Sequence, residues 1–293
     1  MENLHTPVLL SEVLASLAPR AGESYLDLTA GYGGHAEKIL DVTRNYKAST
    51  LVDRDEFAAE YLKQKFAGHP ELEIINQDFY NSVLQLLQCG RTYDMILADF
   101  GVSSLQLDRA DRGFSFKNPG PLDMRMDRRE ALTADKVVNH WPRRDLSNIL
   151  VKYGEYSTGR AEMLARLITE NRPIKDTAEL AKIIANHSGH SHTHPATRVF
   201  QAIRIAVNDE LGQIERTLPL LPKLLNPGGR LALITFHSLE DRLVKDFYKS
   251  AASLGEESEL VVMTKKPITA DQMELVINPR ARSAKLRVAK RAN

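Results

Sequence analysis

Three glycines within four residues, Gly31, Gly33 and Gly34, constrain the fold of this chain most strongly. An apolar, extended stretch at 25–28 precedes them, and a helical pattern begins near Ala36. Glycine permits positive φ and lets a ligand approach the backbone, so the pattern predicts a strand, a tight loop and a helix N-terminus. Such a unit commonly binds nucleotide-like ligands, and the spacing also fits the dinucleotide motif G-x-G-x-x-[GA].

Four aspartates that follow predicted strands narrow the choice of ligand: Asp27, Asp53, Asp78 and Asp99. Asp27, just before the loop, would repel a pyrophosphate but suits a cationic or hydroxyl-bearing ligand such as S-adenosylmethionine. Asp53 is placed for ribose hydroxyls. Asp78 and Phe79 suit an adenine, and Asp99 suits the reactive end of the ligand. Each aspartate alone could simply close a buried strand, but four in order at βα spacing favour ligand binding.

Strand and helix patterns alternate between residues 24 and 99. Strands are expected at 24–28, 49–53, 72–76 and 93–98, and helices at 34–41, 55–66 and 81–88. This order predicts an α/β fold with a parallel, Rossmann-like sheet, whose ligand lies at the carboxyl ends of the strands. A helix expected at 10–17 either covers the ligand as a lid or simply packs beside the loop.

The alternation stops after Asp99, and residues 107–199 are expected to form a small inserted helical domain for substrate recognition. Residues 1–106 and 200–293 then form the sheet domain. The insertion carries 16 Lys and Arg against 12 Asp and Glu. Its first part mixes arginines with Phe114 and Phe116, which favours contact with single-stranded nucleic acid over the alternative of a solvated loop.

The second half of the chain supplies further candidate elements. We expect a helix at 196–221 that returns the chain to the sheet, a turn at 226–229, a strand at 230–236, a helix at 241–250, and strands at 261–263 and 274–277. His237 follows the strand at 230–236 on the ligand side, as a base, a phosphate contact or a structural residue. The histidine cluster occupies a predicted loop without Cys or Glu, so a polar turn is favoured over a metal site, with a phosphate contact as a further alternative. It comprises His187, His190, His192 and His194.

Charge and composition limit both the ligands and the cellular location that the sequence predicts. Residues 280–291 hold six basic residues and no acid, which predicts phosphate binding unless the tail is merely solvated. The formal charge is only +1, so nucleic-acid binding depends on such patches. Cys89 is the only cysteine, which excludes an internal disulfide and fits a reducing cytoplasm. No apolar run approaches the roughly 20 residues of a membrane helix, and no export signal is recognisable, so a cytoplasmic protein without membrane contact is expected.

The acidic edge indicates methyl transfer, in which an enzyme mainly positions and desolvates its reactants. The acceptor is expected against Asp99–Ser104. An exocyclic amine of a base needs an acceptor for its N–H, because its lone pair is delocalised into the ring. Asp99 or a backbone carbonyl of residues 99–101 is the candidate, and His237 is an alternative base.

Longer motifs occur in order along nearly the whole chain: HTPVL at 5–9, GGH at 33–35, DFGVSS at 99–104, RGFSF at 112–116, GPLDMRM at 120–126, HPATR at 194–198, NDEL at 208–211, FHSLEDR at 236–242 and NPRARSAKLR at 278–287. With them the chain resembles the RsmH (MraW) family of bacterial 16S ribosomal RNA cytosine-N4 methyltransferases. Phe100 replaces a usual Leu, and residues 28–30 differ from the commoner wording, but neither change removes a polar contact.

The resemblance implies a Rossmann-like, S-adenosylmethionine-dependent methyltransferase with an inserted helical domain. Its substrate would be N4 of a cytidine in the decoding centre, on the small ribosomal subunit or a late precursor. Carried over by position, the family's cofactor contacts fall on Gly33, Gly34, His35, Asp53, Phe79, Asp99 and Gln106. Asp99 then serves the cofactor, the acceptor or both. No metal is expected, and RNA contacts are expected at Ser103, Ser104, Arg112, Arg125, Arg198, Arg280, Arg282, Lys285 and Arg287.

Two other functions remain as alternatives. Asp27 argues against a nicotinamide oxidoreductase, and the intact loop with Asp53 argues against an inactive RNA-binding ribosome assembly factor that has kept the fold. Binding of S-adenosylmethionine separates these from the methyltransferase. The sequence leaves the oligomeric state open, with a homodimer as one alternative, and we expect a structured ribosomal particle to be preferred over free RNA.

Overall fold

The computed structural model describes residues 7–187, 194–252 and 258–292. The chain divides into two compact units, Met1–Gly101 with Leu211–Asn293, and Val102–Glu210. The sequence had placed these boundaries at 106/107 and 199/200. A helix with the length and apolar character to cross a membrane is absent from the described residues.

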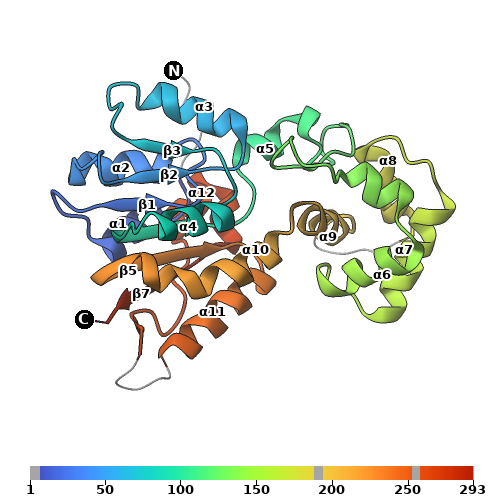
Figure 1. Cartoon of the computed structure of the whole chain (residues 1–293). Coiled ribbons are helices and arrows are strands. Elements are labelled where there is room, and N and C mark those ends of the chain that lie inside the picture. Colours follow the sequence, from blue (N-terminus) through green and yellow to red (C-terminus); the bar gives the residue numbers. More distant parts are fainter. Residues whose placement is uncertain (1–6, 188–193, 253–257, 293) are drawn as a thin grey trace. The chain divides into compact units, whose positions relative to one another are not determined.

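The first unit is built on a seven-stranded sheet in the order β3-β2-β1-β4-β5-β7-β6 (Figure 1). Its strands are β1 (Tyr25–Asp27), β2 (Thr50–Val52), β3 (Glu73–Ile75), β4 (Tyr93–Asp99), β5 (Leu225–Thr235), β6 (Leu260–Val262) and β7 (Lys285–Arg291). Strands β1 to β5 pair in parallel, and β7 is antiparallel to β5 and β6. The predicted α/β fold with a Rossmann-like sheet is confirmed, and β1 to β4 lie within or next to their predicted ranges.

Helices cover both faces of the sheet, and successive residues of a strand point to opposite faces, so each strand contributes to two cores. Met95 and Leu97 of β4 pack in one core with residues of α1 (Leu10–Leu17), α2 (Gly34–Thr43) and α3 (Glu56–Lys65). Ile96 and Ala98 pack in another with residues of α4 (Phe79–Gln88), the 3-10 helix η3 (Leu218–Leu224) and α11 (Ser238–Ala252). A one-residue slip of β4 would exchange the side chains of the two cores, so the strand register is fixed. Because β1, β2, β4 and β5 run parallel, their carboxyl ends share one edge of the sheet.

The basic tail is part of the sheet rather than a free tail. β7 lies between β5 and β6, and Lys285 pairs with Thr235 at the carboxyl end of β5. Leu286 and Val288 are buried between its charged residues. The alternation of apolar and basic residues is therefore a strand signal, which the dense positive charge obscured in the sequence.

The strand expected at 274–277 is wrong, since this segment forms the helix α12 (Gln272–Ile277). Asp271 begins the helix by accepting the Glu274 N–H at 2.7 Å. Met273 and Val276 are exposed, so the apolar residues do not enter the sheet. A short apolar run cannot be assigned to helix or strand from periodicity alone.

The expected helix at 196–221 is interrupted. Helix α9 (Thr197–Asn208) ends at Asp209, whose φ is 47°, and α10 (Glu210–Thr217) follows. The Asn208 side chain accepts the Met126 N–H and donates to the Met124 carbonyl, both at 2.8 Å, which holds the end of α9 against a loop. Apolar periodicity does not record such a contact. The predicted turn at 226–229 falls within β5, where the register shifts between Tyr93 and Met95 on β4.

The second unit is helical in its described residues. It contains α5 (Ser104–Asp108), the 3-10 helix η1 (Ala110–Arg112), the π-helix η2 (Lys136–His140), α6 (Arg143–Lys152), α7 (Thr158–Glu170), α8 (Thr177–Asn186) and α9. Its core includes Leu146 of α6, Leu164 of α7, Leu180 of α8 and Ile203 of α9. Helix α9 thus packs within this unit, whereas the sequence had assigned it to the return toward the sheet.

Candidate active site

The glycine loop connects β1 to α2, as the sequence predicted. Gly31 and Gly33 adopt φ values of 53° and 73°, and Gly33 is the N-cap of α2. A Cβ on Gly33 would lie 2.9 Å from the Leu62 side chain and 3.2 Å from Phe66. Both the backbone conformation and the close approach therefore require glycine at residue 33. The first N–H groups of α2 are left without helical acceptors, which makes them available to a ligand.

Asp53 follows β2 and holds the glycine loop in place. Its carboxylate accepts the Gly31 N–H at 2.7 Å and the Asp55 N–H at 2.8 Å. Burial raises the pKa of Asp53 to about 6, although both hydrogen bonds favour the ionised form. Asp53 lies at the carboxyl edge predicted for a ribose contact and also fixes the backbone of the loop.

Asp27 is buried inside the first unit. It is 1% exposed, accepts the Tyr25 hydroxyl at 2.7 Å, and accepts the Thr29 N–H at 3.1 Å. Burial raises its pKa to about 7. These contacts correspond to the structural alternative for Asp27, a polar residue that closes a buried strand.

Asp99 lies at the end of β4, and its side chain differs from those of Asp27 and Asp53 in its hydrogen bonding. The Asp99 backbone N–H donates to the Thr29 hydroxyl at 2.6 Å, which fixes the end of the strand. Its Oδ1 is buried and has no hydrogen-bond partner within the described part of the chain. Burial, followed by the charges of Asp27 and Glu240, raises the pKa of Asp99 well above its usual value. A buried acceptor without a donor is costly unless a ligand supplies one.

This environment fits a cationic cofactor. A positive charge close to a buried carboxyl favours its ionised form and offsets the desolvation that raises the pKa of Asp99. An N–H donor of a ligand would satisfy Oδ1. Acidic groups at the ends of β1, β2 and β4 therefore make the edge suited to S-adenosylmethionine, as the sequence suggested.

His237 follows β5 and is engaged by Glu240. Its Nε2 lies 2.9 Å from the Glu240 Oε1, although the geometry of this approach does not make a hydrogen bond, and its Nδ1 lies 3.4 Å from the Glu240 backbone nitrogen. Glu240 is fully buried and also accepts the Phe236 N–H at 2.7 Å. Both ring nitrogens thus face one residue, which favours the structural alternative for His237 over a base. The sequence analysis did not single out Glu240, although its i,i+3 spacing from His237 at a helix start is a recognisable signal.

The remaining predicted cofactor residues have different surroundings. Phe79 is the first residue of α4, is partly exposed, and its ring lies 5.7 Å from that of Phe100. Asp78 caps α4 by accepting the Asn81 N–H at 2.9 Å. Phe79 therefore keeps a surface for ring packing with an adenine, whereas the Asp78 carboxylate is used by its own helix.

His35 is buried, and its Nε2 lies 2.9 Å from the Val8 carbonyl oxygen. Gln106 belongs to the second unit, where its amide oxygen accepts the Ser103 N–H at 3.1 Å. The Ser103 hydroxyl in turn accepts the Gln106 N–H at 3.2 Å, which completes a capping box for α5. In this structure both predicted side chains, His35 and Gln106, bind the protein itself. Ser104 is the first residue of α5.

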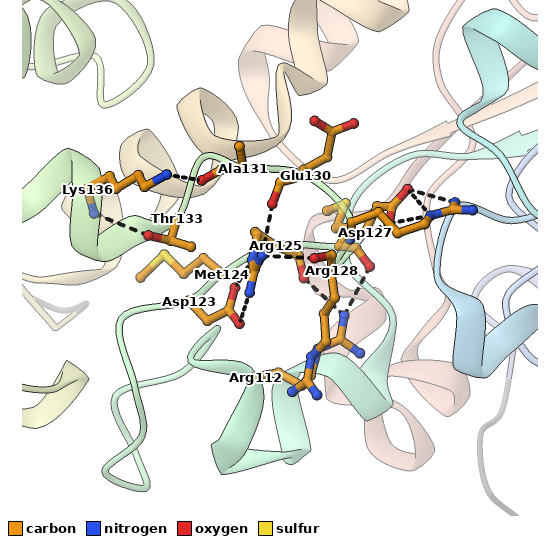
Figure 2. Close-up of polar contacts among 12 residues, drawn as sticks. Arg112, Asp123, Met124, Arg125, Asp127, Arg128, Glu130, Ala131, Thr133 and Lys136 are labelled. Carbon is orange, nitrogen blue, oxygen red and sulfur yellow. Dashed lines mark hydrogen bonds and ion pairs between the residues drawn. The ribbon is translucent and has the colours of Figure 1, made fainter.

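Figure 2 shows the arginine-rich loop of the second unit, which the sequence had assigned to RNA. Arg112 is 2% exposed, and its guanidinium donates to the carbonyls of Arg125 and Met126, both at 3.0 Å. A guanidinium buried in this way has little access to a phosphate, so the structure favours a structural role for Arg112 over the expected RNA contact. Its charge instead holds two segments of the loop together.

Arg125 is also engaged within this loop (Figure 2). Its guanidinium donates to both carboxylate oxygens of Asp123, at 2.7 and 3.1 Å, and to the carbonyls of Arg128 and Glu130, both at 2.8 Å. This bidentate geometry uses the fork that would otherwise bind a phosphate. The Arg125 side chain therefore shapes the loop.

The basic residues near the C-terminus fall into two groups. Arg280 and Arg282 are exposed just before β7, next to the carboxyl edge of the parallel strands because β7 begins opposite Thr235. Lys285 and Arg287 bind Asp241, at 3.2 and 2.7 Å. Arg287 is 8% exposed and its charge serves an ion pair within the unit, which favours a structural role over the predicted RNA contact.

Arg198 and two of the clustered histidines also have protein partners. The exposed Arg198 donates to the Gly154 carbonyl at 2.7 Å and stacks over the Tyr156 ring at 4.3 Å. His187 bonds the Ile183 carbonyl at 3.0 Å, and the His194 Nδ1 accepts the Ala196 N–H at 3.2 Å. The other two members, His190 and His192, lie outside the described residues. Among the residues that are described, no group of three or more His, Cys, Asp or Glu could hold a metal.

Comparison with known proteins shows the family of the chain. The sequence model of the MraW methylase family matches residues 2–292. A ribosomal RNA small subunit methyltransferase H from Trichormus variabilis is 46% identical, with 98% of this chain and 92% of that protein covered. Its counterparts from Trichodesmium erythraeum and Acidobacterium capsulatum are 44% and 43% identical over 98% of this chain, and 99% and 98% of their own lengths are covered. The chain therefore belongs to the MraW methylase family, as its motifs predicted, and is an S-adenosylmethionine-dependent methyltransferase.

Proposed function

We propose that this protein transfers a methyl group from S-adenosylmethionine to the exocyclic N4 of a cytidine in the decoding centre of 16S ribosomal RNA. The relatives' shared name supports ribosomal RNA of the small subunit as the substrate. The decoding centre is what the resemblance of the motifs implies, and the choice of N4 rests on that resemblance and on the chemistry of Asp99. The substrate particle is the small subunit or a late precursor, in the cytoplasm.

The cofactor is held at the carboxyl edge of the sheet. Backbone N–H groups at Gly34 and His35 face the ligand, Asp53 binds the ribose, and Phe79 packs on the adenine. Gln106 is the family position that completes the set. When bound, S-adenosylmethionine supplies an electrophilic methyl group on a positively charged sulfur. The protein's own task is then to orient the acceptor amine and to accept its proton.

The buried, unpartnered Oδ1 of Asp99 is the observation that carries this proposal. A cytosine amino group offers two N–H donors and has a lone pair delocalised into the ring. An ionised Asp99 that accepts one N–H localises this lone pair on nitrogen and takes the proton as the new N–C bond forms. The backbone carbonyls of residues 99–101 remain alternative acceptors.

RNA binding is assigned mainly to exposed arginines. Arg280 and Arg282 lie next to the carboxyl edge, where they can bind phosphates beside the acceptor base. Arg198, Ser103 and Ser104 remain candidate contacts of the second unit. The length of the inserted unit and its basic patches favour a structured ribosomal particle over a short free RNA as the preferred substrate.

The first test is transfer of a labelled methyl group to small subunits from cells that lack this protein, followed by mass analysis of the nucleosides. We expect N4-methylated cytidine from the wild type and none from an Asp53→Ala variant. Methylation of another atom would overturn the substrate assignment. Absence of cofactor binding would favour the alternative of an inactive RNA-binding assembly factor.

A further inference from the structure

The segment Pro7–Leu9, which we call the N-terminal strap, lies against the first turn of α2. A Cβ on Gly34 would lie only 2.5 Å from the Pro7 Cγ, so the strap touches the backbone of the glycine loop. Its Val8 carbonyl oxygen lies 2.9 Å from the His35 Nε2. The strap and the proposed cofactor loop are therefore in direct contact.

A third contact comes from the far end of the chain. The Leu9 N–H donates to the Glu274 Oε1 at 2.7 Å, across 265 positions of sequence. Glu274 lies in α12, so this carboxylate joins the C-terminal helix to the strap. Hydrogen bonds to a carboxylate are stronger than those between neutral groups, so this contact, which we call the lock, stabilises the position of the strap.

The strap needs such a lock because its backbone is strained. Leu9 adopts φ 55° and ψ 34°, the left-handed region that branched and bulky residues rarely enter, and its side chain is fully buried. Leu9 also precedes α1 without any side-chain cap, so Glu274 satisfies an N–H that the helix start leaves open. A conformation of this kind persists only where surrounding contacts hold it.

We propose that His35 and Glu274 are positioning residues that lock the N-terminal strap against the first turn of α2 and so hold the cofactor-binding N–H groups in place. This inference rests on the proposed function of the glycine loop. The His35 ring then contributes through Val8, on the strap side, and only the His35 backbone faces the cofactor. Glu274, which lies outside the family motifs, acts together with His35 in holding the strap.

The test is a double-mutant cycle on the affinity for S-adenosylhomocysteine, measured by calorimetry on the full chain. His35→Phe removes the hydrogen bond and keeps ring volume, and Glu274→Ala removes the lock. We expect each to weaken binding about tenfold, as expected for loss of a hydrogen bond to a charged or buried group. The double variant should bind at most about twofold more weakly than the weaker-binding single variant, because both substitutions act through the same strap.

Matched controls separate the lock from general damage to α12. Glu274→Gln keeps an oxygen acceptor and should bind within about threefold of wild type, given the smaller worth of a neutral hydrogen bond. Met273→Ala, on the exposed side of the same helix, should bind as wild type does. Hydrogen exchange of the Leu9 and Gly34 amides should quicken in Glu274→Ala and not in Met273→Ala.

Three results would overturn the inference. Unchanged binding by Glu274→Ala, while the wild type binds, refutes the lock and leaves the proposed function intact. Additive losses in the double variant mean that the His35 ring contacts the cofactor directly. Failure of the wild type to bind refutes the proposed function and the lock with it. If Glu274→Ala does not fold, Pro7→Gly loosens the strap from its other end, and unchanged binding there is equally decisive.

Discussion

The carboxyl edge of the sheet and the arginine-rich loop of the second unit use charge in opposite ways. At the edge, Asp99 keeps a buried carboxyl oxygen that receives no hydrogen bond from the part of the chain that the structure describes. In the loop, Arg112 and Arg125 are engaged by carbonyls and by Asp123 of the same loop. A charged residue in a sequence can therefore serve either a ligand or the fold, and the charge alone does not tell which case applies.

Replacing Asp99 tests this comparison most severely. Asp99→Asn keeps the shape but removes the ionisable acceptor, so we expect methyl transfer to fall by roughly 10²–10⁴-fold, the usual worth of a positioned acid or base. The variant should be at least as stable as wild type, because a neutral amide replaces a carboxyl that burial disfavours. Turnover on small subunits and a thermal unfolding curve measure the two effects. Asp78→Asn, at the cap of α4, is the control and should retain activity.

Replacing Arg112 tests the other side of the comparison. Arg112→Met keeps much of the bulk but leaves the carbonyls of Arg125 and Met126 without their donor. We expect the free energy of unfolding to fall by about 3 kcal/mol, within the range for breaking a buried charged contact. Denaturant unfolding gives this value, and Arg129→Met, whose side chain is exposed, should change it by less than about 0.5 kcal/mol. If the Arg112 variant is fully stable but binds RNA poorly, the structural assignment is wrong.

The pH dependence of stability sharpens the comparison within the edge itself. The folded-state pKa of Asp27 is about 7, above its unfolded value, so the native state binds more protons than the unfolded state between these two values. Stability from this residue is therefore present at low pH and is lost as the pH rises through 7. Between pH 5 and pH 8 we expect wild type to lose about 2 kcal/mol more than Asp27→Asn does. Denaturant titrations of both proteins at the two pH values measure the difference, and equal slopes would contradict it.

The sequence was most informative where local backbone chemistry decides the structure. Gly33 requires positive φ and has no room for a side chain, and the alternating pattern around it predicted β1 to β4. It was least informative where partners are distant in sequence. Glu274 reaches Leu9, and Arg287 reaches Asp241, and no local pattern records either contact. Asp209 likewise breaks a helix whose apolar periodicity continues through it.

The smallest expected effect concerns the exposed arginines before β7. Arg282 lies next to the carboxyl edge, so Arg282→Ala should weaken binding to small subunits a few-fold and lower the salt slope by about 0.7–0.9, as for one lost phosphate contact. Stability should not change, since the residue is exposed. Arg44→Ala is the matched control, because Arg44 ends α2 at the opposite edge of the sheet. Binding measured across a salt series decides the outcome. If both variants shift the slope equally, RNA binding depends on total charge alone, and the division between exposed arginines and those buried or paired within the protein loses its functional meaning.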